Sequence, residues 1–281
     1  MWINLVFLLL SSPYIIRFFS ISSSDNTGEE INIMSYNVRL FNNYDKQLKY
    51  GKNVDEEIIN YVNTVEIDIF CIQEYYNPKK DLNFNFKCST IDREGSKANQ
   101  HMAIYSNYEI INDTINSGME DMYNTCIFSD IIINEDTIRV YNVHLASNFF
   151  NQKDFSNLTS TETEKVKDGI FGMSKKLKYS FKRRGDEVTK IKNHIQSSPY
   201  PTIICGDFND TPVSYSYQEL SENKKDAFLE SGNGIGATFT KIPTLRIDYI
   251  LFDKEFNSND FTTHQKELSD HRAISCKLKL D

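Results

Sequence analysis

Acidic, amide and imidazole side chains recur at the ends of apolar runs that have the length of β-strands. They are Asn37, Gln73 and Glu74, Asn142 and His144, Asp207 and Asn209, Asp248, and Asp270 with His271. An unpaired carboxylate at the end of a sheet is costly to desolvate, and a bound cation would offset that cost. Oxygen-rich ligands with few sulfurs suit Mg²⁺ or Mn²⁺ better than Zn²⁺. The pattern therefore indicates a divalent-metal site.

Taken one at a time, these residues have ordinary structural explanations. Residues 206–209 (GDFN) are typical of a tight turn, in which Gly supplies an unusual dihedral angle and Asp or Asn bonds the backbone. Glu74 could cap a helix, and His144 lies between two apolar residues, as a core histidine would. It is their joint occurrence, in this order along the chain, that favours a catalytic interpretation.

The apolar runs themselves predict the elements that would position these side chains. Strands are predicted at 31–37, 67–72, 102–105, 127–133, 138–145, 202–205, 247–252 and 273–280. Residues 54–62 carry apolar side chains at helical spacing. The short connection between 127–133 and 138–145 is typical of a hairpin, so the sheet cannot be wholly parallel. A mixed α/β architecture is expected.

A long helix is predicted from about residue 164 to residue 195, with possible interruptions near Gly169 to Gly172 or at Gly185. Its middle is strongly basic. The basic residues are Lys175, Lys176, Lys178, Lys182, Arg183 and Arg184. Such a cluster binds phosphate in some proteins and is a solvated helix face in others, and the second interpretation is favoured here.

The N-terminus differs in kind from the rest of the chain. Residues 2–16 form an almost uncharged, hydrophobic run that precedes Arg17 and a polar linker. The run is shorter than the roughly 20 residues of a spanning helix and lacks a basic region before it. A membrane anchor through residues 2–19 is favoured, with a cleaved signal or a packed soluble segment as alternatives. Residues 1–24 are thus assigned to an anchor or signal with its linker, and an envelope location is expected.

Bulk composition narrows the possible functions. The chain has 281 residues, a formal net charge of −8 and a sequence pI near 5.3, which disfavours tight non-specific binding of duplex nucleic acid. Five cysteines without a C-x-x-C pair argue against a disulfide framework and against a structural zinc site. The length fits one catalytic domain at 25–281.

Six short blocks in this order resemble the endonuclease/exonuclease/phosphatase superfamily, which includes deoxyribonuclease I. The blocks are 35–38 (SYNV), 71–74 (CIQE), 142–145 (NVHL), 206–209 (GDFN), 246–250 (RIDYI) and 269–271 (SDH). The similarity extends over roughly 31–280 and is greatest to bacterial members with an N-terminal hydrophobic anchor. It implies a four-layer α/β sandwich, with two mixed β-sheets packed face to face and helices outside.

The resemblance also implies a role for each residue. Glu74 would be the principal metal ligand, and Asn37 and Asp270 would complete or support a site for Mg²⁺ or Mn²⁺. His271 would act as general base, oriented by Asp248. The remaining residues would contact water or substrate: Asp207, Asn209, Asn142 and His144. The expected partner is a phosphoester, either a nucleic acid or a phosphorylated small molecule or lipid.

Three functions remain open at this point. A metal-dependent phosphodiesterase or nuclease is favoured, a phosphomonoesterase of the inositol- or lipid-phosphate kind or a sphingomyelinase-like enzyme is the alternative, and a non-catalytic binding module is the third. The completeness of the site argues against the last. One departure from the family is residues 99–102 (NQHM), where many relatives have Gly. His101 is interpreted as an exposed loop histidine rather than as an added substrate contact.

Overall fold

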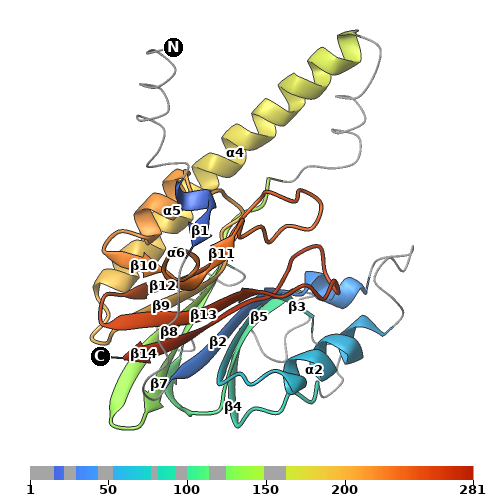
Figure 1. Cartoon of the computed structure of the whole chain (residues 1–281). Helices are drawn as coiled ribbons and strands as arrows, with labels where there is room; N and C mark the ends of the chain where they lie inside the picture. The colour runs from blue at the N-terminus through green and yellow to red at the C-terminus, as the bar shows by residue number, and fades with distance from the viewer. Residues whose placement is uncertain are drawn as a thin grey trace.

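A computed structural model describes residues 16–21, 30–43, 53–76, 82–92, 100–113, 125–148 and 163–280. Two six-stranded sheets form the centre of the molecule (Figure 1). The first has the order β10 (Lys224–Asp226), β12 (Asp248–Asp253), β9 (Thr202–Asp207), β8 (Asp136–His144), β7 (Cys126–Ile133), β6 (Glu109–Asp113). The second has the order β13 (Phe256–Thr263), β14 (Ile274–Leu280), β2 (Ile31–Asn37), β3 (Ile69–Tyr75), β5 (His101–Ser106), β4 (Cys88–Ile91).

Both sheets are mixed, as the sequence predicts. In the second sheet β2 and β3 run parallel, and in the first sheet β8 and β9 run parallel, while the other pairs within these two sheets are antiparallel. Each parallel pair lies near the middle of its sheet, and its two strands end at the same edge. Residues at the carboxyl ends of these four strands are therefore brought to one region between the sheets.

The strands are hydrophobic on both faces because both faces are covered. In β3, Ile69 and Cys71 belong to the core between the sheets, whereas Phe70 and Ile72 pack in the outer cluster beneath α2 (Val54–Thr64). On the first sheet, Tyr141 and other outward residues pack with α4 (Thr163–Gln196) and α5 (Tyr215–Leu220). Burial on two sides explains why these strands read as unbroken apolar runs. The result is the expected four-layer sandwich.

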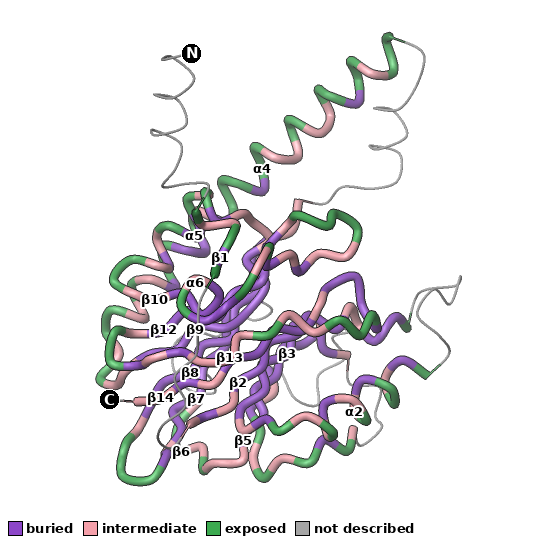
Figure 2. The backbone as a smooth tube through the Cα atoms, viewed as in Figure 1, coloured by how far each residue is buried: buried purple, intermediate pink, exposed green. Residues whose placement is uncertain are grey.

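The long helix α4 is continuous from Thr163 to Gln196, so the interruptions expected at its glycines are absent. An added side chain at Gly172 would meet nothing within 4 Å, and one at Gly185 would meet only a ring atom of Tyr215 at 3.9 Å. A helix tolerates such glycines at a cost of roughly 0.5–1 kcal/mol each. Val188 and Ile191 bury the second half of α4 against the first sheet, while its first half projects beyond the sheets with mostly exposed residues (Figures 1 and 2).

Part of the predicted N-terminal segment packs on the folded body. The turn η1 (Ile16–Phe18) leads into β1 (Ser20–Ile21), which pairs with β11 (Asn233–Gly234). The backbone carbonyl of Arg17 accepts a hydrogen bond from Arg246 at 2.9 Å. Residues 16–21 of the predicted segment 1–24 therefore contact the folded body. Residues 2–15 of the hydrophobic run lie outside the described residues.

Two further short elements complete the described fold. The helix α6 (Ala227–Ser231) begins at Asp226, whose carboxylate accepts from the backbone N–H of Phe228 at 3.0 Å, and the turn η2 (Arg39–Asn42) follows β2 directly. Among the residues that the structure describes, no helix has the length and apolar character needed to span a membrane.

Candidate active site

The carboxyl ends of β2, β3, β8 and β9 bring together Asn37, Glu74, His144 and Asp207. The Nδ2 atom of Asn37 lies 3.0 Å from the Oδ2 atom of Asp207 and 3.4 Å from the Oε1 atom of Glu74. The amide thus links a carboxylate of one sheet to a carboxylate of the other. As it is placed, Asn37 turns its NH₂ group to both carboxylates, and its oxygen accepts from the backbone N–H of Arg39 at 3.0 Å.

Glu74 owes its position to an irregularity in β3. The register between β3 and β5 shifts between Ile72 and Tyr75, and Glu74 has a positive φ of 49°. A bulge of this kind redirects a side chain, and a left-handed conformation in a residue other than Gly is a strain typical of functional sites. The side chain keeps 25% of its surface exposed. Glu74 is therefore a carboxylate that solvent can reach at the edge of a buried cluster.

Residues 206–209 form the tight turn that the sequence indicates, and the same turn faces the site. The backbone N–H of Asn209 donates to the Oδ1 atom of Asp207 at 2.8 Å. The side-chain amide of Asn209 donates to the Oδ2 atom of Asp207 at 3.1 Å and to the carbonyl of Leu145 at 2.9 Å. The structural and functional interpretations of this stretch are thus compatible, because the turn fixes the carboxylate of Asp207.

Gly206 is required for this turn, and its replacement by Ala should destabilise the protein by about 3 kcal/mol. The residue has φ +146°, and a Cβ atom there would collide with the backbone carbonyl of Val143. Gly172→Ala is the matched control, since its Cβ would meet nothing within 4 Å and should stabilise α4 slightly. Urea unfolding of both variants measures the difference. Equal midpoints would refute the assignment.

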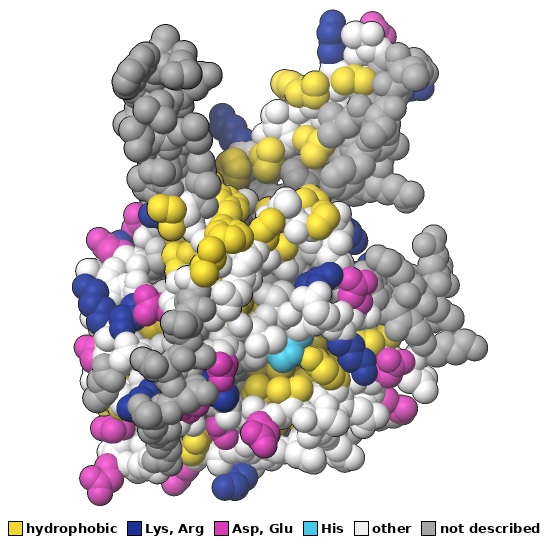
Figure 3. All heavy atoms as spheres, viewed as in Figure 1, with side chains coloured by type: hydrophobic (Ala, Val, Ile, Leu, Met, Phe, Trp, Pro, Cys, Tyr) yellow, Lys and Arg dark blue, Asp and Glu magenta, His cyan; other side chains and the backbone are white. Residues whose placement is uncertain are grey.

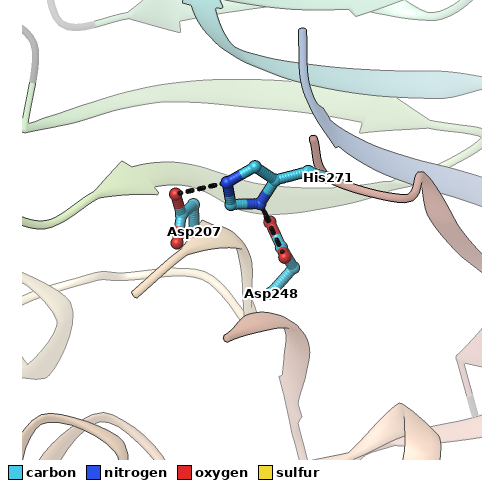
Figure 4. A group of neighbouring side chains, drawn as sticks. All are labelled: Asp207, Asp248 and His271. Atoms are coloured by element: carbon cyan, nitrogen blue, oxygen red, sulfur yellow. Dashed lines mark hydrogen bonds and ion pairs between the residues drawn. The ribbon is translucent and has the colours of Figure 1, made fainter. Parts of the chain in front are cut away.

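His271 and Asp248 form the predicted contact, although they are 23 positions apart in the sequence (Figure 4). The Nδ1 atom of His271 lies 3.0 and 3.2 Å from the two carboxylate oxygens of Asp248. The other ring nitrogen, Nε2, points towards the Oδ2 atom of Asp207 at 3.7 Å. Asp248 does not pair with Arg246, which instead binds Asp226 at 2.8 Å. The expected dyad is thus confirmed as a geometric feature.

The charges around His271 act strongly on its ionisation. Burial alone would lower the pKa of His271, but the carboxylates of Asp248 and Asp207 outweigh burial and raise the pKa to about 10. Burial raises the pKa of Asp207 to about 6, against the opposing effect of His271. In the protein alone, this carboxylate cluster therefore holds His271 in its protonated form at neutral pH.

His144 enters the same cluster from the end of β8. Its Nε2 atom lies 3.6 Å from Glu74 and 3.8 Å from Asp207, and this buried atom has no hydrogen-bond partner in the described part of the chain. Gln100 approaches the other ring nitrogen, Nδ1, at 3.4 Å. A donor at Nδ1 leaves the proton of a neutral ring on Nε2. His144 is therefore oriented to donate a hydrogen bond into the site.

Asp270 is held by two cations that the sequence did not single out. Its Oδ2 atom lies 2.7 Å from the Nζ atom of Lys241 and 3.4 Å from the Nε atom of Arg39. Burial alone would raise the pKa of Asp270, but the charges of His271 and Lys241 outweigh it and lower the pKa. The contacts of Asp270 are thus with basic side chains. Its predicted role beside Glu74 and Asn37 stays a prediction.

Two expectations are wrong. Asn142, predicted to contact substrate, is completely buried; its amide donates to the carbonyls of Ile72 and Ala103 and accepts from Gln73 at 2.7 Å. Both N–H groups of its amide are therefore used in joining the two sheets, and the fully buried side chain does not face the site. His101, interpreted as an exposed loop histidine, is 3% exposed at the start of β5.

The cluster offers ligands suited to a divalent cation. One ligand atom from each of Asp207, Asp248 and His271 can be chosen so that all lie within 4.8 Å of one another. Asp248, however, already holds the imidazole of His271, whereas the contacts of Glu74 with other described residues are the long ones given above. Glu74 and Asn37, which lie beside Asp207, are therefore the better candidates for ligands of the cation. The partnerless Nε2 of His144 indicates that a further group belongs in this space.

The protein is a four-layer α/β sandwich whose two mixed sheets pack face to face. Its acidic and histidine side chains gather at the carboxyl ends of the parallel strands, an arrangement suited to catalysis. This chain belongs to the endonuclease/exonuclease/phosphatase family, whose family model matches residues 34–271. A search of curated protein sequences finds no match to the chain.

Solved structures share the fold at low sequence identity. An endonuclease/exonuclease/phosphatase family protein from Bacteroides thetaiotaomicron has a TM-score of 0.66 and 16% identity, with 91% of this chain and all of that one covered. A mannosyl-6-phosphatase from the same organism has a TM-score of 0.60 and 16% identity, covering 89% and 100%. The human Nocturnin catalytic domain, solved with a bound sulfate anion, also has a TM-score of 0.60 and 16% identity, covering 90% and 95%. At this identity the likeness shows the fold alone.

Proposed function

We propose that this protein is a divalent-metal-dependent hydrolase of phosphoesters, and most specifically a phosphodiesterase. The observation that carries the proposal is the His271–Asp248 pair, whose free ring nitrogen points into a cluster made by Asp207, Glu74 and His144. Family membership supports the reaction class, because nucleases and phosphatases give the family its name. A non-catalytic scaffold would not require a histidine oriented in this way.

Each residue of the site has a separate role in the proposed hydrolysis. His271 accepts a proton from the attacking water at Nε2, while Asp248 holds its Nδ1–H and stabilises the charged ring. Asp207, fixed by Asn209, positions that water close to Nε2. His144 donates from its Nε2 to a phosphate oxygen as negative charge develops there. Positioning and charge stabilisation are the main contributions expected in phosphoryl transfer.

Glu74 is the proposed principal ligand for Mg²⁺ or Mn²⁺, with Asn37 beside it and Asp270 in support. The donor set is oxygen-rich, as these hard cations require. For Asn37 to offer its oxygen, the amide must turn over and give up the bond to the Arg39 backbone. When bound, a divalent cation supplies positive charge that stabilises the phosphate and offsets the carboxylates that otherwise keep His271 protonated.

The balance of charge in the site favours a diester over a monoester. Four carboxylates gather here, against three positively charged side chains: protonated His271, and Arg39 and Lys241, which both contact Asp270. A phosphodiester carries one negative charge, whereas a monoester carries close to two at neutral pH. Among the described residues the site thus has an excess of negative charge, to which the second charge of a monoester would add.

The dyad predicts a specific effect of Asp248→Asn. The variant should keep its fold and its metal affinity but lose about 10³- to 10⁴-fold in turnover, because it disfavours the productive tautomer and removes the charge that stabilises the imidazolium. Steady-state hydrolysis with Mg²⁺, alongside Mn²⁺ titration calorimetry, measures both quantities. Asp253→Asn is a control in the same strand. Turnover near that of the wild type would refute the dyad.

A panel of substrates tests the proposed function. Purified protein with Mg²⁺ should hydrolyse bis(p-nitrophenyl) phosphate faster than p-nitrophenyl phosphate. Plasmid DNA, RNA, sphingomyelin and inositol phosphates then separate the nuclease, headgroup-diesterase and phosphomonoesterase possibilities. A preference for monoesters throughout would replace the diesterase proposal by the phosphatase alternative. Absence of hydrolysis with every member of the panel would contradict an enzymatic role.

A further inference from the structure

Exposed hydrophobic side chains gather at the end of the molecule from which α4 projects. Figure 3 shows them along α4 and on the surface below it. They come from four separate segments: Ile170, Phe171, Tyr179 and Phe181 of α4; Ile16, Phe19 and Ile21 near β1; Ile235 and Ile242 of the loop after β11; and Val213 and Tyr215 before and in α5. Scattered single residues need no explanation, but a contiguous exposed set indicates an interaction site. We call these residues the apolar end.

The projecting half of α4 is basic as well as apolar. Between Gly169 and Gly185 the helix carries six Lys and Arg residues and no Asp or Glu, in a chain whose net charge is −8. Arg183 and Arg184 contact Glu187 and Asp210, and the other four are lysines. By helical spacing Ile170 and Phe181 share one face. Lys178 lies about 70° from the centre of this face on one side, and Lys176 lies about 130° from it on the other. Phe171 lies on the Lys178 flank and is 74% exposed. This is the distribution of an amphipathic helix that lies in a charged interface.

The apolar end reaches the active site through the loop between β11 and β12. Phe239 of this loop packs edge-on against the ring of His271 at a centroid distance of 5.4 Å, and Lys241 binds Asp270. The next residue, Ile242, is 44% exposed. A surface that contacts Ile242 would therefore lie only a few residues along the chain from groups that touch the catalytic cluster.

The hydrophobic run at the N-terminus enters the fold at the same end. Residues 2–15 precede Ile16. The carbonyl of Arg17 accepts a hydrogen bond from Arg246, and the guanidinium of Arg17 donates one to the carbonyl of Pro212. The exposed Phe19 and Ile21 follow at once. The hydrophobic run of the sequence is thus followed directly by described residues that belong to the apolar end.

We propose that the apolar end is a docking surface for a lipid bilayer with anionic headgroups. Apolar side chains would enter the interface, and the lysines of α4 would contact the headgroups from its flanks. A second copy of the chain fits this surface less well, because pairing two such helices would bring together eight lysine charges, four from each copy. The acidic remainder of the protein would be repelled from the same bilayer, which orients the apolar end towards it.

One consequence for the substrate rests on the proposed function. Docking would place the catalytic cluster beside the bilayer, so the substrate would be a phosphodiester displayed at a membrane surface. The docking itself does not depend on catalysis. The two ideas can therefore fail separately, and the experiment measures vesicle binding and hydrolysis of a soluble diester independently.

The test is sedimentation of the full chain with vesicles of phosphatidylcholine alone or mixed with phosphatidylserine. The chain is used in its native form and with Leu8→Ser, Leu9→Ser and Leu10→Ser, which weaken the N-terminal run without removing it. In the protein that carries the three Leu→Ser substitutions, Ile170→Ser combined with Phe171→Ser should lower vesicle binding by about tenfold or more. Ile111→Ser is the matched control, since Ile111 is 46% exposed on β6, at the other end of the molecule (Figure 2).

The basic flank is tested in the same way. Lys175→Gln, Lys178→Gln and Lys182→Gln together should lower binding to the serine-containing vesicles about tenfold and leave the weak binding to neutral vesicles unchanged. All variants should hydrolyse bis(p-nitrophenyl) phosphate as the parent does. Selective loss of vesicle binding supports docking even if no variant, nor the parent, hydrolyses the diester.

Three results would overturn the proposal. The first is unchanged vesicle binding by the Ile170→Ser, Phe171→Ser protein, and the second is equal binding to neutral and anionic vesicles. The third is absence of vesicle binding together with self-association, seen by light scattering, that these substitutions abolish. That last result would make the apolar end an interface between copies of this chain.

Discussion

Replacement of His271 by Ala is expected to lower turnover by about 10³-fold or more while metal affinity stays nearly intact. The reason is geometric: Nε2 of His271 is the ring nitrogen left free by Asp248, and it faces Asp207 in the centre of the cluster. Removing the imidazole removes the proposed base without removing Glu74 or Asn37. Steady-state hydrolysis and Mn²⁺ titration calorimetry measure the two quantities.

His264→Ala provides a matched control for the loss of a histidine. His264 is bonded to Tyr61 and Ser275 on the second sheet, apart from the catalytic cluster. Its loss should affect stability more than turnover. Equal loss of turnover in both variants, at equal stability, would show that the effect of His271 is not that of a catalytic base.

The second large effect is expected for Glu74→Gln, which should weaken metal binding by about 100-fold or more and lower activity accordingly. The substitution keeps the size of the side chain and removes the charge that a hard cation requires. Raised metal concentration should restore part of the activity, a rescue that His271→Ala should not show. Glu57→Gln, on the exposed side of α2, is the control.

The pair of variants separates the two proposed roles. If His271→Ala lost metal affinity as fully as Glu74→Gln, then the ligand set would have to include His271, in line with its closeness to Asp207 and Asp248. If Glu74→Gln bound metal normally, then Glu74 would not be the principal ligand, and the proposed division between ligand and base would be wrong.

Much of the site could be predicted because residue type and order carry information about chemistry. The resemblance pairs Asp248 with His271, a general base needs such an orienting carboxylate, and the structure has this contact. The four-layer fold followed from the resemblance, and the mixed sheets followed from a single hairpin connection. The interruptions of α4 that the sequence left open at its glycines are absent, because a glycine lowers helix stability only modestly.

Asn142 shows why residue type alone does not give a role. An amide in a motif block can contact a substrate or join two sheets, and the sequence is the same in both cases. Only the distances to the carbonyls of Ile72 and Ala103 decide between them. The expectation for His101 is wrong for a related reason. Its position in a polar stretch suggests a loop, but in the structure His101 begins β5 and contacts Asp92, which follows β4.

The basic residues beside Asp270 could not have been found from sequence. Lys241 stands in a loop without a motif, and Arg39 follows the first block without a spacing that predicts an ion pair. Short or polar strands were also missed, among them β10, β11 and the polar edge strand β13. Their pairing depends on neighbours distant in the sequence rather than on their own composition.

The central claim is that this protein hydrolyses phosphodiesters with a divalent metal held at Glu74 and a base at His271. The most direct measurement is hydrolysis of bis(p-nitrophenyl) phosphate by the purified full chain, first in excess EDTA and then after addition of Mg²⁺ or Mn²⁺. The account predicts no turnover with chelator, recovery with either metal, and no recovery in His271→Ala. Full turnover in excess chelator, or full recovery by the His271→Ala protein, would contradict it.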